Sequence, residues 1–176
     1  AAAAGRAEAE GAAEAALACG LWRYARAPLL HDGGRTAALS DGWVASMIGW
    51  MGRPAGGGRA ALVRSRVEGA VLEMVGEVAL CLGAEGASQL HADLCMASRS
   101  DDGPTRLGAL RGLGRLYTVL GDAALMHVPN AVPFVTELVE DGEEDVRAEA
   151  AATLKQLEGL AKEEFDVDRE RAVARR

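Results

Sequence analysis

The sequence has few aromatic residues and few runs of strand-forming side chains. Aromatics make up 4% of the 176 residues, although hydrophobic residues make up 49%. Ala, Gly, Leu and Val supply most of the apolar side chains, and Ala and Leu together with Glu and Arg favour helices. The 22 glycines lower the intrinsic stability of any helix that contains them. Packing between helices therefore has to supply the remaining stability. The composition therefore predicts an all-α fold.

A positive surface, a membrane-spanning run and a disulfide framework are also missing. The net charge is −7, whereas neutralising phosphates needs basic side chains, so the composition argues against a general nucleic-acid binder. No apolar run approaches the roughly 20 residues that cross a bilayer. Cys19, Cys81 and Cys95 are odd in number and far apart, which favours a reduced intracellular compartment.

The start of the sequence lacks both a signal peptide and an initiator Met. Ala1–Ala4 have neither the charge nor the Leu-rich build of a secretory signal. We therefore expect the chain to be the C-terminal fragment of a longer protein.

Apolar residues recur three and four positions apart along nearly the whole chain, as they do on one face of an α-helix. The predicted helices cover about residues 7–24, 36–51, 59–82, 87–98 and 104–120, with one after Pro129 and one after the acidic turn 140–144. Gly83 and Gly121 are expected to end helices, and Glu68-Gly69 to break or bend one. The residues expected to face inward include Leu90, His91, Leu94 and Cys95, then Val132, Val135, Leu138 and Val139, and finally Val146, Ala150, Leu154 and Leu157.

An internal repeat of 41 residues is the most informative pattern. The same offset relates Arg106 to Arg147, Ala109 to Ala150, Leu113 to Leu154, Leu116 to Leu157 and Leu94 to Val135. A period near 41 that contains two helices is typical of HEAT and armadillo arrays, whose helix pairs must stack on their neighbours. We predict a HEAT-type α-solenoid of about seven helices in antiparallel pairs over residues 1–165, followed by a charged tail over residues 166–176.

Residues 127–157 resemble a complete HEAT repeat, with Pro133 in the first helix, Asp141 in the turn and Val146-Arg147 opening the second helix. More narrowly, the segment is similar to the C-terminal end of the U-three-protein-ten family, the large HEAT-repeat subunit of the small-subunit processome. The similarity rests on five stretches: Val128-Pro129-Asn130 with Val132-Pro133-Phe134-Val135, the acidic turn 140–146, residues 94–102, Arg106–Leu110, and the apolar helix Val71–Leu82. A departure lies at Gly86-Ala-Ser-Gln89, where the family often has Trp or Lys-Pro.

The resemblance implies a scaffold of ribosome biogenesis in the nucleolus. The family belongs to the UtpA subcomplex of the U3 ribonucleoprotein, acts in pre-18S rRNA processing and is linked to rRNA transcription. By resemblance, the partners would be other UtpA proteins, with pre-rRNA and U3 small nucleolar RNA nearby in the assembled particle. A generic HEAT adaptor in transport, phosphatase or chromatin assembly is the alternative, with the same fold and other partners.

Two sets of charged residues are candidates for specific roles. Arg106 and Arg147 each follow an acidic turn, so a structural Asp–Arg ladder between repeats is predicted for Asp101, Arg106, Asp141 and Arg147. Arg is also a good bidentate ligand for phosphate, which keeps a phosphate contact as the alternative. The candidate contacts for RNA or a partner protein are Arg53, Arg59, Arg64, Arg66, Arg111, Arg115 and Trp50. A solvated face remains open for all of these basic residues.

Motifs for catalysis, metals and cofactors are weak or lacking. Ser88, His91 and Asp93 lie within two turns of one helix, where they cannot converge as nucleophile, base and orienting acid. His31 and His127 are isolated in the sequence, and no Cys/His set has zinc spacing. The glycines at 56–58 lack the Lys-Ser/Thr of a phosphate loop. We expect a non-enzyme without cofactor, metal, membrane or small-molecule substrate.

Overall fold

The computed structural model describes the backbone of residues 59–174 and the side chains of residues 67–162. All regular structure in this part of the chain is helical, as the composition predicts. The elements are α3 (Arg59–Gly86), α4 (Ser88–Ala97), α5 (Gly103–Leu120), the 3-10 helix η1 (Gly121–His127), α6 (Val128–Leu138) and α7 (Glu144–Ala174). The predicted helices over residues 7–24 and 36–51 lie outside the described residues, so the total of seven helices stays a prediction.

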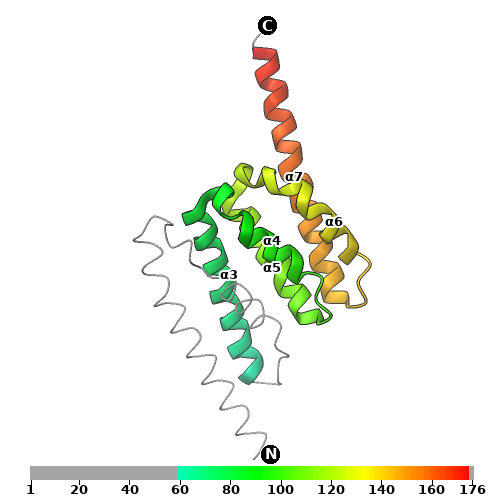
Figure 1. The fold of residues 1–176 in the computed structure, drawn as a ribbon. Helices are drawn as coiled ribbons and strands as arrows, with labels where there is room; N and C mark the ends of the chain where they lie inside the picture. Colours follow the sequence, from blue (N-terminus) through cyan, green and yellow to red (C-terminus); the bar gives the residue numbers. More distant parts are fainter. Residues whose placement is uncertain (1–58, 175–176) are drawn as a thin grey trace, which may run out of the picture.

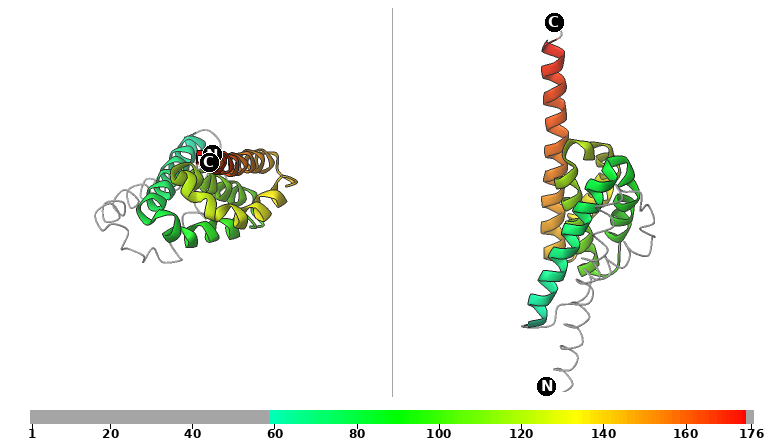
Figure 2. Two further views of the ribbon diagram at one scale, coloured as in Figure 1. Left: turned by 90° about the horizontal axis from the view of Figure 1, so that it is seen from above. Right: turned by 90° about the vertical axis from the view of Figure 1, so that its left-hand side faces the viewer.

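The helices form two layers (Figures 1 and 2). α5 lies in the middle of one layer and packs on α3 and on α7, while α4 and α6 cover α5 and α7 from the other layer. Successive helices run in opposite directions, so α4 with α5 and α6 with α7 are antiparallel pairs (Figure 1). The described residues therefore form the stacked helix pairs of an α-solenoid.

The 41-residue period appears directly in the helix positions. α4 ends at Ala97 and α6 at Leu138, while α5 begins at Gly103 and α7 at Glu144. Side chains at equivalent positions are also buried alike. The buried pairs are Leu94 with Val135, Ala109 with Ala150, and Leu116 with Leu157.

One pair of equivalent residues, Leu113 and Leu154, differs in burial because α5 and α7 have different numbers of neighbours in their layer. Leu113 is fully buried, whereas Leu154 is only partly buried. α5 has a neighbour on both sides, but among the described helices α7 contacts only α5 within that layer. The side of α7 away from α5 is therefore uncovered in the part of the chain that the structure describes.

The helix ends follow from local chemistry. Gly83 and Gly121 have positive φ angles of 67° and 53°, which L side chains rarely adopt, and each interrupts or ends a helix as predicted. At the start of α5, the Asp102 side chain accepts a hydrogen bond from the Thr105 backbone N–H at 2.9 Å. Pro104 lies in the same first turn, where its missing N–H costs nothing.

Several local predictions were wrong. Val132, expected to face inward, is 37% exposed, and its neighbour Ala131 is fully buried instead. The helix is continuous through Glu68-Gly69, because the only non-helical residue inside α3 is Gly83. The short helix η1 between α5 and α6 was not predicted at all.

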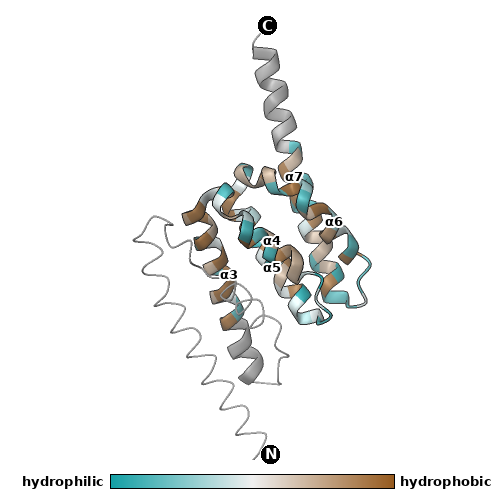
Figure 3. Ribbon diagram, viewed as in Figure 1, coloured by the Kyte–Doolittle hydropathy of each residue, from teal (hydrophilic) through white to brown (hydrophobic). Residues whose placement is uncertain are grey.

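The last helix is longer than its apolar pattern suggests. α7 continues to Ala174, through most of the segment predicted as a charged tail, and extends beyond the other helices in Figure 1. The proposed boundary between residues 165 and 166 itself stays a prediction. Where Figure 3 colours the helices, apolar residues lie along them, whereas the α4–α5 and α6–α7 turns are polar. Over the described residues, no helix is long and apolar enough to cross a membrane.

Candidate functional site

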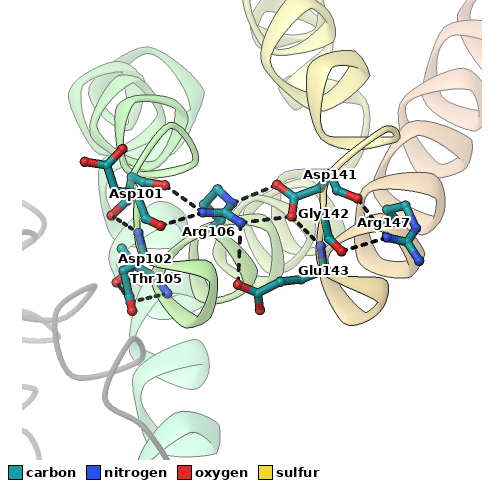
Figure 4. A network of polar contacts seen from close by, with 9 residues as sticks. Asp101, Asp102, Thr105, Arg106, Asp141, Gly142, Glu143 and Arg147 are labelled. Carbon is teal, nitrogen blue, oxygen red and sulfur yellow. Dashed lines mark hydrogen bonds and ion pairs between the residues drawn. The ribbon is translucent and has the colours of Figure 1, made fainter.

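Arg106 joins the two described repeats at the α4–α5 and α6–α7 turns (Figure 4). Its Nη2 donates a hydrogen bond to Asp141 Oδ1 at 2.9 Å, and its Nε lies 2.8 Å from Asp141 Oδ2. The Nε contact is an ion pair only, since its N–H is not aligned into a hydrogen bond. Glu143 Oε1 lies farther away, 3.6 Å from Nη2. The two main partners are largely buried, with 15% of the Arg106 side chain and 8% of the Asp141 side chain exposed.

The remaining terminal nitrogen of Arg106 holds its own turn. Nη1 donates hydrogen bonds to the backbone carbonyls of Ser100 and Asp101 at 2.9 and 3.0 Å. Asp101 thus contributes a carbonyl oxygen to the ladder. One guanidinium therefore closes the turn before α5 and binds the carboxylate of the next repeat.

Arg147 occupies the equivalent place at the start of α7. Its Nη1 donates hydrogen bonds to the carbonyls of Asp141 and Gly142 at 2.8 and 3.1 Å (Figure 4). The four predicted ladder residues therefore lie together around two turns. Among these four residues, the structure shows one contact between two side chains, the ion pair of Arg106 with Asp141.

The electrostatics match this geometry. The hydrogen bond from Arg106 lowers the pKa of Asp141, against the effect of burial, and the nearby charge of Arg147 lowers it further. Asp141 in turn raises the pKa of Arg106. Both groups are therefore charged at neutral pH, and their ion pair joins the two repeats.

Arg111, a candidate RNA contact, is bound by two carboxylates from neighbouring helices. Its Nη1 pairs with Glu68 on α3, and its Nε donates to Glu149 Oε2 on α7 at 3.2 Å. Burial lowers the pKa of Arg111, but the hydrogen bonds and charges of Glu68 and Glu149 outweigh this effect and raise it. Arg111 thus links the three helices of one layer, and its charge is compensated.

Of the other candidate contacts, the structure describes the side chain of Arg115. Arg115 is partly buried and lies over Gly76 of α3, where a Cβ would come within 2.8 Å of its Nε. Arg59, Arg64 and Arg66 lie on α3, in the part whose side chains the structure does not describe. Trp50 and Arg53 lie outside the described residues. These residues stay predicted contacts.

Ser88, His91 and Asp93 have separate partners. Ser88 Oγ donates to the Glu85 carbonyl at 2.7 Å, and Asp93 Oδ1 accepts from Gln89 at 2.8 Å. His91 is buried and faces the core. Neither Ser88 nor Asp93 is hydrogen-bonded to His91, so the three residues do not form a catalytic triad.

A buried polar cluster around His91 was missed in the sequence. His91 Nε2 lies 3.0 Å from the Tyr117 hydroxyl, and its ring stacks on His127 with centroids 4.6 Å apart. His127 Nε2 donates to the Ala84 carbonyl at 2.8 Å, so this residue is not isolated in the fold. Cys95 Sγ lies 3.7 Å from His91 Nε2. The inward prediction for His91 pointed here, but nothing in the sequence placed His127 beside it.

Burial controls the protonation of this cluster. Desolvation, with the charge of His127, lowers the pKa of His91 to about 4. Desolvation also raises the pKa of Cys95 to about 11, so the thiol stays protonated and unreactive at neutral pH. No group of three or more His, Cys, Asp or Glu within the described residues could hold a metal ion.

Comparison with known proteins gives this geometry a context. Residues 103–157, from the start of α5 into α7, match the family model of the HEAT-like repeat. The chain is 35% identical over 78 residues to U3 small nucleolar RNA-associated protein 10 of Phaeosphaeria nodorum. The resemblance predicted from the sequence is confirmed.

Further relatives carry the same name. The proteins from Aspergillus fumigatus and Emericella nidulans are 37% identical over 62 residues and 36% identical over 66 residues. These matches cover 35–44% of this chain but only 3–5% of each relative, so the chain spans a small part of the proteins that it resembles. No solved structure matches the chain.

Proposed function

We propose that this chain is a non-catalytic scaffold segment of a small-subunit processome protein that acts in ribosome biogenesis. The observation that carries the proposal is its similarity to U3 small nucleolar RNA-associated protein 10 of several fungi, at 35–37% identity in three of them. The helix pairs support it, because stacked repeats offer an extended surface to partners. The named relatives are associated with U3 small nucleolar RNA, which makes the nucleolus the proposed location.

Protein contacts are the proposed mode of action of this segment. The net charge is −7, and Arg111 is already bound by Glu68 and Glu149. Phosphate affinity grows with the number of charges that are neutralised together, so a basic surface is needed for strong RNA binding. Partners would therefore be other proteins of the UtpA subcomplex, with U3 RNA and pre-rRNA close by only in the assembled particle.

Depletion of the protein in its own cells, followed by rescue with a tagged copy, tests the proposed function. Depletion should reduce mature 18S rRNA and accumulate its unprocessed precursor, and a tagged copy should concentrate in the nucleolus and co-purify with U3 RNA. A copy that lacks this segment should fail to restore 18S rRNA. Normal precursor processing after depletion, with the tagged protein in a transport, phosphatase or chromatin assembly, would contradict the proposal and favour the generic adaptor.

A further inference from the structure

Arg147 repeats the setting of Arg106, but among the described residues it has no carboxylate partner. Arg106 holds the carbonyls of residues 100 and 101, and Arg147 holds those of residues 141 and 142, each 41 positions later. The two guanidinium groups are thus fixed in the same way at the start of α5 and α7. Arg106 uses Nε and Nη2 to bind Asp141, whereas no carboxylate pairs with Arg147 among the described residues.

The unpaired edge of Arg147 lies at the end of the described array. Figure 4 shows one of its terminal nitrogens on the two carbonyls and the other directed away from the labelled residues. At the start of α7, Arg147 is therefore fixed as Arg106 is at the start of α5, but no carboxylate of the described residues binds it. A bidentate guanidinium is a strong and directional ligand for a carboxylate.

We propose that Arg147 binds a carboxylate that a partner protein presents in the turn of a helix pair, in the way that Asp141 is presented to Arg106. The partner would extend the stack by one repeat-like unit and would pack along the far side of α7. This inference rests on the scaffold role proposed above, but not on ribosome biogenesis.

The neighbouring surface of α7 is suited to a close helix. Ala148, Ala151 and Ala152 are exposed. Their equivalents on α5, 41 positions earlier, are Leu107, Leu110 and Arg111, which are buried or half-buried in the layer between α3 and α7. Small side chains let two helix axes approach to the usual 8–10 Å, roughly, without a clash.

The charges nearby favour a single carboxylate over nucleic acid or a second copy. Five of the six residues 140–145 are acidic, so a phosphate chain along this turn would meet several negative charges at once. One carboxylate reaches Arg106 although Asp101 and Asp102 precede it, which provides a precedent within the chain. In a second copy, the carboxylate at the matching place of the turn is Asp141, and its own Arg106 already binds it.

A site-specific photocrosslink from the full-length protein tests the inference. A photoreactive amino acid replaces Ala148, which is exposed, and crosslinking is carried out in extracts of the cells that make the protein. The crosslinked peptide is identified by mass spectrometry. We expect a turn between two helices of another protein, with an Asp or Glu in it, and at least a tenfold loss of crosslink in Arg147→Glu.

Three further variants keep the result interpretable. Arg147→Glu also removes the hydrogen bonds to the turn carbonyls, so Ala151→Trp, a steric block at an exposed position, provides a second route to the same loss. Lys162→Glu, the same charge reversal at an exposed position farther along α7, should leave the crosslink unchanged. Changing the partner's acidic residue to Arg should restore the crosslink to Arg147→Glu.

Several results would overturn the inference. They are a crosslink to nucleic acid, to a second copy or to another part of the same protein, a partner turn without a carboxylate, or no effect of Arg147→Glu and Ala151→Trp. Failure of the reciprocal charge change would also overturn it. None of these results bears on 18S rRNA maturation, which tests the proposed function separately.

Discussion

The Arg106 guanidinium lies 2.8 Å from the carboxylate of Asp141, 35 residues later in the chain, and joins α5 to the α6–α7 turn. Both side chains are largely buried, and both make additional hydrogen bonds to backbone groups of the turns. Removal of one partner would leave the other charge buried and unpaired, which costs far more than losing a solvated pair. Among the ion pairs that the structure describes between the two repeats, this one has the most buried side chains.

The first prediction concerns this link. Asp141→Ala should lower the free energy of unfolding by about 3 kcal/mol, because Arg106 would keep its charge in a largely buried place. Urea denaturation at neutral pH measures the loss. Glu137→Ala is the matched control: Glu137 also binds an arginine, Arg99, through two atoms, but both side chains are about half exposed. It should cost under roughly 1 kcal/mol, and equal losses in both variants would contradict the role of burial.

Much of this array is encoded in local sequence patterns. The 41-residue spacing of Arg106 and Arg147 predicts the repeat, and Gly83 and Gly121 predict two helix ends because only backbone conformation is involved. The direction of the ladder is harder to predict. Arg106 pairs with the carboxylate of the next turn, while Asp101 offers only a carbonyl. That choice depends on how one helix pair is rotated on the next.

Contacts between distant helices could not be predicted from the pattern. Arg111 is bound by carboxylates from α3 and α7, which depends on the relative rotation of three helices. His127 lies beside His91 because η1 carries the chain from α5 back onto α3, and η1 has no clear signal in its seven residues. The error at Val132 is a matter of helical phase, since its neighbour Ala131 takes the buried place.

The second prediction concerns the core of the last repeat. Val146→Asp should lower the free energy of unfolding by about 4 kcal/mol, because the side chain is only 1% exposed and a carboxylate there has no partner. Leu154→Asp should cost less, since Leu154 is partly buried and the new carboxylate can reach solvent. Thermal melting followed by far-UV circular dichroism measures both. Ala151→Asp, at an exposed position on the same helix, should melt like the parent. A larger loss of stability in Leu154→Asp than in Val146→Asp would contradict the deeper burial of Val146.

The third prediction concerns acid sensitivity at His91. The unfolded chain binds a proton at this residue below about pH 6.5, but the folded chain only below a pKa of about 4. Between these values the unfolded state holds more protons, so stability falls as the pH is lowered. The loss should approach about 3 kcal/mol near pH 4. Urea midpoints measured from pH 7.5 to 4.5 should fall less steeply in His91→Gln than in the parent.

The comparison of slopes isolates His91 from the carboxylates, which titrate in both proteins. Tyr117, Cys95 and His127 face the His91 ring, and Cys95 stays protonated throughout this pH range. Parallel pH profiles for parent and His91→Gln would show that His91 is not held neutral by the fold.

The last prediction concerns RNA. This chain alone should bind structured RNA only weakly, with a Kd above roughly 10⁻⁵ M at physiological salt, near the non-specific range. The physical reason is that its net charge is −7 and that Arg111, the best-placed basic candidate, is already neutralised by Glu68 and Glu149. Fluorescence anisotropy with U3 RNA and a pre-rRNA leader as probes measures the affinity.

Charge reversal shows whether the same arginines serve structure or RNA. Arg111→Glu would place three carboxylates together across α3, α5 and α7, so it should lower the melting temperature and leave the weak RNA affinity unchanged. Arg115→Glu is the matched variant one turn later, where no Glu pair is broken among the described residues. It should destabilise the fold less than Arg111→Glu. Sub-micromolar binding with a steep salt dependence, lost in both variants without a change in melting, would instead make this layer of the array an RNA surface.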